Sequence, residues 1–229
     1  MNGLRKTRIF IVLAVVFGCF AAIFLSDIPK VQKYRRGEIK DYNSVGFGEL
    51  EKGDLVQGII DDTDGCIAEM EETNTTFGIP TSKHTSKRYY ALYTVNHTYV
   101  LYATGRESEY DALDQLARES AAYYDNLEEL YQAGGEDADF SSVSLPETML
   151  EFTGEVEEMP DDLRGIFQKW YGEGFAQDCE TNIVIQSANF GRFSWVLYAG
   201  AWCAVLAVVM LVLTVISLRK QKRNQQYGY

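Results

Sequence analysis

The sequence predicts an α+β fold in which two transmembrane helices flank one extracytoplasmic domain. Residues 9–25 and 194–218 contain no charged side chain, and runs of about 20 apolar residues are long enough to cross the hydrocarbon core of a bilayer. All 33 acidic residues lie in the segment between them. That segment is rich in aromatic and β-branched residues with strand and helix periods, so we expect it to fold into a compact domain.

These features divide the chain into six parts. They are a cytoplasmic N-terminus (1–8), a first transmembrane helix (9–25), a juxtamembrane linker (26–44), the extracytoplasmic α+β domain (45–193), a second transmembrane helix (194–218) and a basic cytoplasmic tail (219–229). A cleaved signal peptide is the alternative for the first apolar segment, because basic residues precede it. Its apolar run is longer than the core of a usual signal peptide, which favours a retained helix.

Small residues recur along one face of each apolar segment. Ala14, Gly18 and Ala22 are spaced by four residues in the first segment, as are Gly200 and Ala204 in the second. Such faces let helices approach closely in a membrane, which predicts a helix hairpin or self-association through the spans. Ordinary use of Gly and Ala in membrane helices is the alternative. Neither segment contains Asp, Glu, Lys, Arg or His, which argues against a transporter, proton relay or channel.

The first half of the central segment predicts four antiparallel strands in two hairpins. The strands cover residues 54–60, 66–70, 88–95 and 98–103. The first pair flanks Asp61–Gly65, and Asp-Gly between apolar runs is a strong hairpin signal because both residues tolerate positive φ. The second pair flanks Asn96–His97. The polar residues 71–87 are expected to form a loop between the hairpins.

The second half predicts two helices and two further strands. The first helix begins near Ser108, which with Asp111 resembles a capping box, and ends at Gly134–Gly135. One face of this helix carries residues at helical spacing, namely Leu113, Leu116, Ala117, Ser120, Ala121, Tyr124, Leu127 and Tyr131. A strand at 149–156, a short helix opened by Pro160 and a strand at 181–186 follow. The sheet is expected to be either a small barrel or an open antiparallel sheet covered by the two helices.

Basic residues near the span ends decide the expected orientation. Seven Lys and Arg lie on the side of the termini and six on the side of the central segment. The four that follow the second segment are the clearer signal, which places the central segment outside the cytoplasm at the cell membrane. The sequons at Asn74 and Asn96 fit this orientation. In the opposite one, the basic residues from Lys30 to Lys40 would lie against an anionic leaflet.

Metal sites and familiar catalytic motifs are not predicted. Asp61–Gly65, together with Glu71, suggests a calcium-binding loop. The EF-hand pattern needs an acidic residue at the position of Ile60, however, so a hairpin turn is the preferred interpretation. His84 and His97 lie in no zinc-binding spacing. No nucleophile elbow, Walker loop or dinucleotide fingerprint is present. The sequence therefore predicts no cofactor and no catalytic residue, although it leaves an enzyme with an unrecognised site open.

Cysteines and tyrosines each leave two interpretations open. Cys66 and Cys179 are the only cysteines of the central segment, and they are expected either to form a disulfide or to remain buried thiols. The tyrosines at 89, 90, 93, 99, 102, 123, 124 and 131 could form a recognition surface, since Tyr supplies contact area with a polar tip. Strand alternation places about half of them in the core instead.

The layout of the chain resembles an uncharacterised family of two-pass membrane proteins from Gram-positive gut bacteria. The resemblance rests on the first span, residues 53–60 (GDLVQGII), 88–93 (RYYALY) and 153–156 (TGEV), and the closing span. It implies no activity. The lipid bilayer is the expected partner, and a net charge of −12 argues against nucleic acid. A binding, scaffold or sensing protein is the leading hypothesis, and a tethered enzyme or an accessory subunit of a membrane complex are alternatives.

Overall fold

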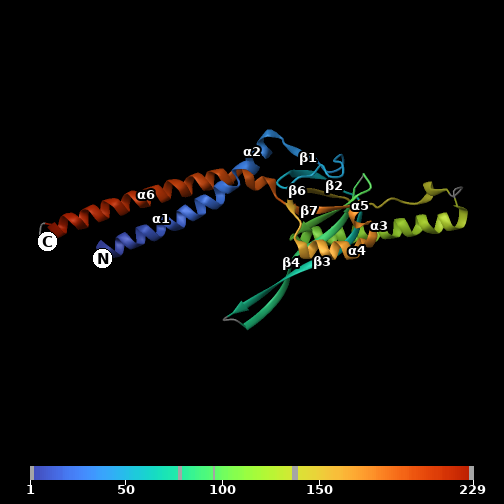
Figure 1. Ribbon diagram of the computed structural model, residues 1–229, viewed down its shortest axis with the longest axis horizontal. Helices are drawn as coiled ribbons and strands as arrows, with labels where there is room; N and C mark the ends of the chain where they lie inside the picture. Colours follow the sequence, from blue (N-terminus) through green and yellow to red (C-terminus); the bar gives the residue numbers. More distant parts are fainter. Residues whose placement is uncertain (1–2, 77–78, 95, 136–138, 227–229) are drawn as a thin grey trace. The chain divides into compact units, whose positions relative to one another are not determined.

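The chain divides into two compact units. The computed structural model (Figure 1) describes residues 3–76, 79–94, 96–135 and 139–226. One unit is the continuous segment Glu38–Asn189, and the other joins Met1–Gly37 to Phe190–Tyr229. The first is a mixed α/β domain and the second is helical. Helix α2 (Ile28–Arg36) and strand β1 (Ile39–Asp41) lie in the range expected to be a linker.

A seven-stranded sheet forms the centre of the α/β domain. Its strands are β1, β2 (Leu55–Ile60), β3 (Thr63–Thr76), β4 (Ile79–Tyr93), β5 (Tyr99–Thr104), β6 (Leu150–Glu158) and β7 (Cys179–Ser187). They lie in the order β1-β2-β6-β7-β5-β4-β3. The pairs β1–β2 and β5–β7 are parallel, and the other four pairs are antiparallel.

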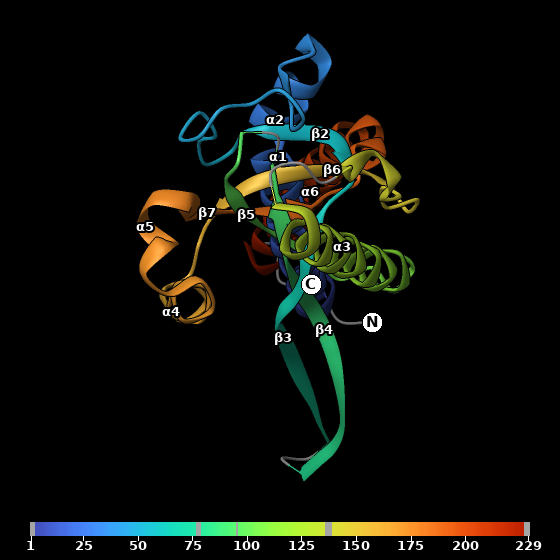
Figure 2. The ribbon, with the colours of Figure 1, turned by 90° about the vertical axis from the view of Figure 1, so that its right-hand side faces the viewer.

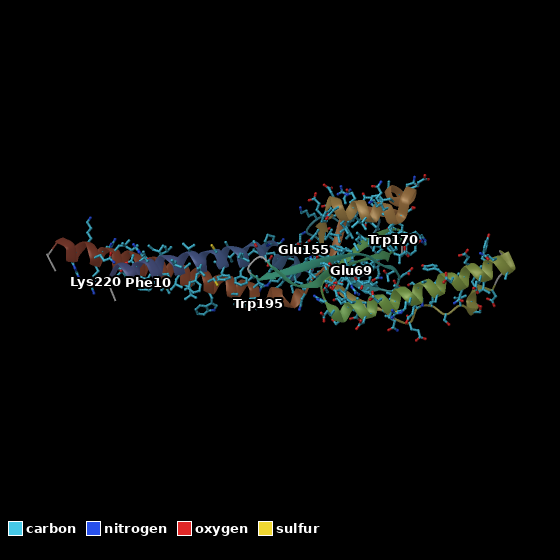
Figure 3. The ribbon with its side chains drawn as sticks, turned by 90° about the horizontal axis from the view of Figure 1, so that it is seen from below. Phe10, Glu69, Glu155, Trp170, Trp195 and Lys220 are labelled. Carbon is cyan, nitrogen blue, oxygen red and sulfur yellow. The ribbon has the colours of Figure 1, made fainter. Side chains whose placement is uncertain are left out.

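The sheet is open and mixed, so the barrel alternative is wrong, and the expectation of a wholly antiparallel sheet is also wrong because β1–β2 and β5–β7 are parallel. Strands β1 and β3 are its two edges. Helices cover both faces: α3 (Glu107–Gly134) lies on one side, and α4 (Asp161–Tyr171) with α5 (Phe175–Asp178) on the other (Figures 2 and 3). Short 3-10 turns occupy Phe140–Ser142, Gly172–Gly174 and Phe190–Arg192. A barrel would enclose one face as its interior, whereas apolar residues on both faces require two covering layers.

Strand alternation divides the core between the two faces. Tyr90 and Leu92 of β4 are fully buried on the α3 side, whereas the neighbouring Ala91 is buried on the α4 side. Val100 and Leu101 of β5 divide in the same way. Because successive side chains point to opposite faces, a continuous apolar run indicates a strand covered twice. The two central strands β5 and β7 therefore anchor both clusters.

The hairpin expected at Asp61–Gly65 does not form. Strand β2 pairs with β1 and β6, and β3 pairs with β4. Asp61 and Asp62 connect β2 to β3, and these two strands lie in opposite halves of the strand order. Gly65, with φ of 100°, lies at a pairing irregularity inside β3. The Asp-Gly signal identified a residue that needs positive φ, but a bulge uses this freedom as readily as a turn does.

The expected loop at 71–87 is also wrong, because its described residues, 71–76 and 79–87, extend β3 and β4 into a long two-stranded arm. Pairing continues to Thr76 and Ile79, and the arm projects from one end of the sheet (Figures 1 and 2). Its polar sequence lacks the alternation of a strand with one buried face. Outside the sheet both faces of a hairpin lack a core to pack on, so hydrophobicity gives no strand signal there.

Other elements agree closely with the sequence. The hairpin of β4 and β5 around Asn96–His97 is confirmed, and so are the helix that ends at Gly134 and the strands at 149–156 and 181–186. The capping box is wrong: Arg106 is the N-cap of α3, and no side chain caps the helix. Pro160 precedes α4 as its N-cap residue.

The helical unit pairs two long apolar helices. They are α1 (Gly3–Ser26) and α6 (Phe193–Gln226), which pack against each other. Two segments within this unit, Thr7–Arg36 and Trp195–Arg223, are long and apolar enough to cross a membrane. Near their shared end Phe24 packs edge-on against Trp195, with ring centroids 5.8 Å apart.

The interface between α1 and α6 uses small residues at seven-residue spacing. Ala14 and Ala21 of α1 are buried. On α6 the buried residues include Gly200, Ala207 and Thr214. The small-residue faces expected at four-residue spacing fit this interface only in part. Ala14 and Gly200 lie in it, whereas Ala22 is exposed and Ala204 is half-buried. A Cβ atom built at Gly18 would meet no atom within 4 Å. A period of seven keeps one face toward the partner along a left-handed helix pair.

Polar contacts join the same two helices at the end near the termini. The hydroxyl groups of Thr7 and Ser217 lie 2.6 Å apart, and the side-chain amide of Gln221 donates to the Thr7 hydroxyl at 2.8 Å. Hydrogen bonds between helices are favoured where little water competes for the donors. These contacts fix the pairing register of α1 and α6.

Candidate functional site

A small pocket brings together tyrosines and aspartates at one end of the α/β domain. Its volume is about 260 Å³. The lining residues are Asp61, Asp62, Tyr93, Thr94, His97, Tyr123, Tyr124, Leu145 and Pro146. They come from the β2–β3 connection, the β4–β5 turn, α3 and the segment that precedes β6. Ligand pockets for drug-sized molecules have about 300 to 1,000 Å³, so this space suits a small chemical group.

The aspartates of the β2–β3 connection join the sheet to the helices on both faces. Tyr124 of α3 donates its hydroxyl hydrogen to Asp62. Two residues further along, Asp64 accepts the corresponding bond from Tyr171 of α4. Alternation alone would place residues two apart on the same face. Asp62 lies before β3, however, and the pairing of β3 shifts between Thr63 and Gly65, so the two aspartates reach different faces. The acidic run therefore serves tertiary contacts rather than a turn.

The β4–β5 turn sets the opposite wall of the pocket. The backbone N–H of Thr94 donates to the carbonyl oxygen of Thr98 at 2.9 Å, and that of His97 donates to the Thr94 oxygen at 3.0 Å. His97 has φ of 60°, which is uncommon for a residue other than glycine although histidine tolerates it better than most. This conformation brings the Nδ1 atom of His97 to 2.8 Å from the Tyr93 hydroxyl.

The electrostatics of the pocket favour positive charge. Among the described residues that line it, Asp61 and Asp62 are the acidic ones, and none is Lys or Arg. One carboxylate oxygen of Asp62, Oδ1, is buried and has no hydrogen-bond partner among the residues that the structure describes. The other oxygen of this carboxylate accepts from Tyr124, so Oδ1 is the part of the acid that lacks a donor among the described residues.

Two tyrosines that line the pocket, Tyr93 and Tyr124, have raised pKa values and remain protonated at neutral pH. Burial, and after it the negative charge of Asp62, raises the pKa of Tyr93. The pKa of Tyr124 is raised by burial first and by its hydrogen bond to Asp62 second. The adjacent Tyr99 has a pKa of about 12, raised by burial and then by Asp64. These phenols can supply ring faces and hydrogen bonds, whereas a catalytic base would need a lower pKa.

A larger groove of about 740 Å³ lies along β1, β2 and β6, but many of its polar groups already have partners. Asn43 uses its side-chain oxygen and nitrogen on the backbone of Ile59. Thr153 donates to the carbonyl oxygen of Ala188, and Arg106 donates to Glu109 at 2.7 Å. These side chains hold the strands and the start of α3 in place, so the smaller pocket is the better candidate for a binding site.

Some of the tyrosines considered for a recognition surface lie in the core, and others line the pocket. Tyr89, Tyr90 and Tyr102 are buried in the core, as alternation predicts. Tyr93, Tyr123 and Tyr124 line the pocket. The sequence could not show that Asp62 lies beside them, because strand β3 pairs with β4 rather than with β2. The signal that was present is an acidic run followed by an apolar strand, and it was interpreted as a turn.

The remaining candidate residues do not form a metal or disulfide site. Among the described residues, no group of three His, Cys, Asp or Glu side chains could hold a metal ion. Cys66 and Cys179 are free thiols. Cys66 packs toward the α3 side and Cys179 toward the α4 side of the sheet, on strands separated by two others, which is too far for a disulfide. The side chains of Asn74 and His84 lie outside the described residues.

Comparison with known proteins gives no match: no family model, no curated protein and no solved structure is similar to the chain.

Proposed function

We propose that this chain is a two-pass integral membrane protein that displays the domain Glu38–Asn189 outside the cytoplasm as a ligand-binding module. The observation that carries the proposal is the outer surface of the helix pair. In the most apolar part of each candidate span only 11% of the residues are buried. A core helix of a soluble protein would be mostly buried, so an apolar surface of this extent needs lipid as its solvent.

The side chains on that surface suit a bilayer. Val12, Val15 and Ile23 of α1 are each about 60% exposed, and Val205 and Val208 of α6 are similarly exposed. Trp195, Tyr198 and Trp202 of α6 are also exposed, and amphipathic aromatic rings are enriched where the hydrocarbon core meets the headgroups. The basic residues from Arg219 to Arg223 follow the apolar run of α6, as expected for a cytoplasmic flank.

Binding fits the α/β domain better than catalysis does. The candidate pocket combines three tyrosine rings with two aspartates. Because the pKa values of Tyr93 and Tyr124 are raised, this arrangement suits recognition better than proton transfer. We therefore place the protein in the cell membrane with a sensing or scaffold role that depends on its pocket.

A pair of lysine substitutions tests the membrane anchor. Val209 and Val212 lie on the exposed surface of α6, so V209K/V212K would be tolerated if that surface faced water. If it faces lipid, each Lys opposes insertion by about 2.5 to 3.5 kcal/mol on biological insertion scales. We expect the native chain to stay in the membrane pellet after alkaline carbonate and to dissolve in maltoside detergent. The double variant should lose insertion of α6.

The control replaces the same two residues by leucine, V209L/V212L, which should remain in the membrane. Release of the native chain by carbonate would show that the helices are not integrated. Because α1 still anchors the lysine variant, loss of α6 insertion is measured as a change in the side of the membrane on which Lys222 lies, and an unchanged side would show that α6 does not cross the bilayer. Either result would remove the proposed anchor.

A further inference from the structure

The pocket between α3 and the β4–β5 turn has walls of a kind that recognises organic cations. Tyr93, Tyr123 and Tyr124 contribute aromatic rings. Leu145 and Pro146 contribute apolar surface from the segment before β6, and Leu145 is 70% exposed. Aromatic faces carry negative electrostatic potential and attract cations, with the strongest effect where water is partly excluded.

The hydrogen-bonding groups of the pocket are largely committed to protein partners. The Tyr124 hydroxyl donates to Asp62, and the Tyr93 hydroxyl pairs with His97. The free oxygen of Asp62 is buried, so it exerts its charge on the pocket without an accessible lone pair. A primary ammonium carries three N–H donors that need acceptors, and of the two lining carboxylates only Asp61 is exposed to accept from them. A methylated ammonium needs none, and its methyl groups pack on aromatic and apolar walls.

We propose that this pocket binds a quaternary ammonium group of the trimethylammonium type. The proposal rests on the binding role proposed above and names the chemical class of its ligand. Asp61 and Asp62 supply the opposite charge, the tyrosine rings supply the cation–π contacts, and Leu145 and Pro146 cover the methyl groups. Because both lining charges are negative, a ligand that also carries a carboxylate or phosphate beside the ammonium binds less tightly than a simple cation.

Titration of the full chain in maltoside micelles tests this proposal, since maltoside carries no ammonium group. Choline is the probe, and 3,3-dimethyl-1-butanol is its uncharged counterpart of the same shape. In isothermal titration calorimetry, choline should bind with a dissociation constant at least tenfold lower than that of the alcohol. Glycine betaine, which adds a carboxylate, should bind more weakly than choline. Equal affinity for choline and the alcohol would overturn the role of charge.

Two variants and two matched controls connect the binding to the pocket. Asp62→Asn keeps an oxygen that accepts from Tyr124 but removes the charge, and Tyr124→Leu removes a ring. Each should weaken choline binding at least tenfold, which corresponds to about 1.4 kcal/mol. The controls Asp111→Asn and Tyr131→Leu change exposed residues of α3 that do not line the pocket. Both controls should bind choline with the affinity of the native chain.

Folding and ligand source are resolved in the same experiment. Circular dichroism identifies a variant that unfolds, and in that case Asp62→Asn, the conservative change, decides the outcome. Unchanged choline affinity in a folded Asp62→Asn variant would contradict the proposal. A short-chain phosphocholine lipid below its micelle concentration tests a headgroup as source. Because its phosphate lies beside the ammonium, we expect it to bind more weakly than choline, as for a site that takes a free solute, and tighter binding would contradict the role given to the two aspartates. If neither bound, the pocket assignment would be wrong while membrane integration would be unaffected.

Discussion

Glu109 shows how one residue secures the start of helix α3. Its side chain is 8% exposed, yet its carboxylate has three partners. The Tyr102 hydroxyl donates to it at 2.9 Å, Arg106 donates at 2.7 Å, and the Ser187 hydroxyl donates at 3.3 Å. Glu109 lies in the first turn of α3, where the helix dipole also favours negative charge. A buried carboxylate is tolerated because it is fully paired.

Removal of this carboxylate should destabilise the domain strongly. Glu109→Ala leaves the Arg106 guanidinium and the Tyr102 hydroxyl without their partner, and breaking a buried charge pair costs about 3 to 5 kcal/mol. We expect a loss near the lower end, because Arg106 is partly exposed. Urea unfolding in maltoside micelles, followed by circular dichroism, measures the change. Glu107→Ala, an exposed neighbour, serves as control, and equal stability of the two variants would contradict the account.

Residue patterns predicted the core tyrosines but could not predict their polar partners. Alternation alone indicated that Tyr90 and its neighbours would divide between two faces. The bond between Tyr90 and Asp114, at 2.8 Å, joins β4 to α3, and the bond between Tyr124 and Asp62 joins α3 to the β2–β3 connection. Such pairs depend on which strands are neighbours, and strand order is decided by contacts distant in sequence.

At the scale of elements, the small-residue face of the helix pair is the feature that substitution can test most sharply. A Cβ atom at Gly200 would lie 3.1 Å from atoms of Phe24 and Leu25, whereas one at Gly18 would meet nothing. Leucine at position 200 should therefore push α1 and α6 apart, since packed interfaces do not absorb extra methylenes without shifts. Leucine at position 18 should leave the pair intact.

A crosslink between the helices measures this difference. Thr7 and Ser217 have hydroxyl oxygens 2.6 Å apart, so T7C/S217C should form a disulfide in a background without the four native cysteines. Gly200→Leu should reduce the yield of this crosslink severalfold, and Gly18→Leu should not. A lower yield with Gly18→Leu, or an unchanged yield with Gly200→Leu, would show that the interface lies on another face.

Elements whose signals are local were predictable, and those that depend on distant partners were not. The apolar spans, the hairpin at Asn96–His97 and helix α3 follow from composition, turn residues and period. The arm of β3 and β4 gave no signal, because its residues 71–87 are polar and its strands pair outside the core. The open sheet was left undecided beside a barrel, because hairpin signals do not say whether the edge strands meet.

At the scale of the whole molecule, the charge is distributed unevenly along the chain. The formal charge of −12 combines a strongly acidic central segment with basic residues near both termini. The acidic character therefore belongs to the α/β domain, which fits a module that attracts cationic ligands. The charge count near the span ends could not fix the orientation, because six basic residues on the side of the central segment, four of them in α2, nearly balance the seven near the termini.

Topology mapping tests the central claim that the α/β domain is displayed outside the cytoplasm. Single cysteines replace Ser142 of the domain or Lys222 of α6, both exposed, in a background without Cys19, Cys66, Cys179 and Cys203. Intact cells are treated with a membrane-impermeant maleimide, and permeabilised cells show that both sites can react. We predict labelling at position 142 and none at 222 in intact cells. Labelling at 222 but not at 142 would contradict the proposed display of the domain.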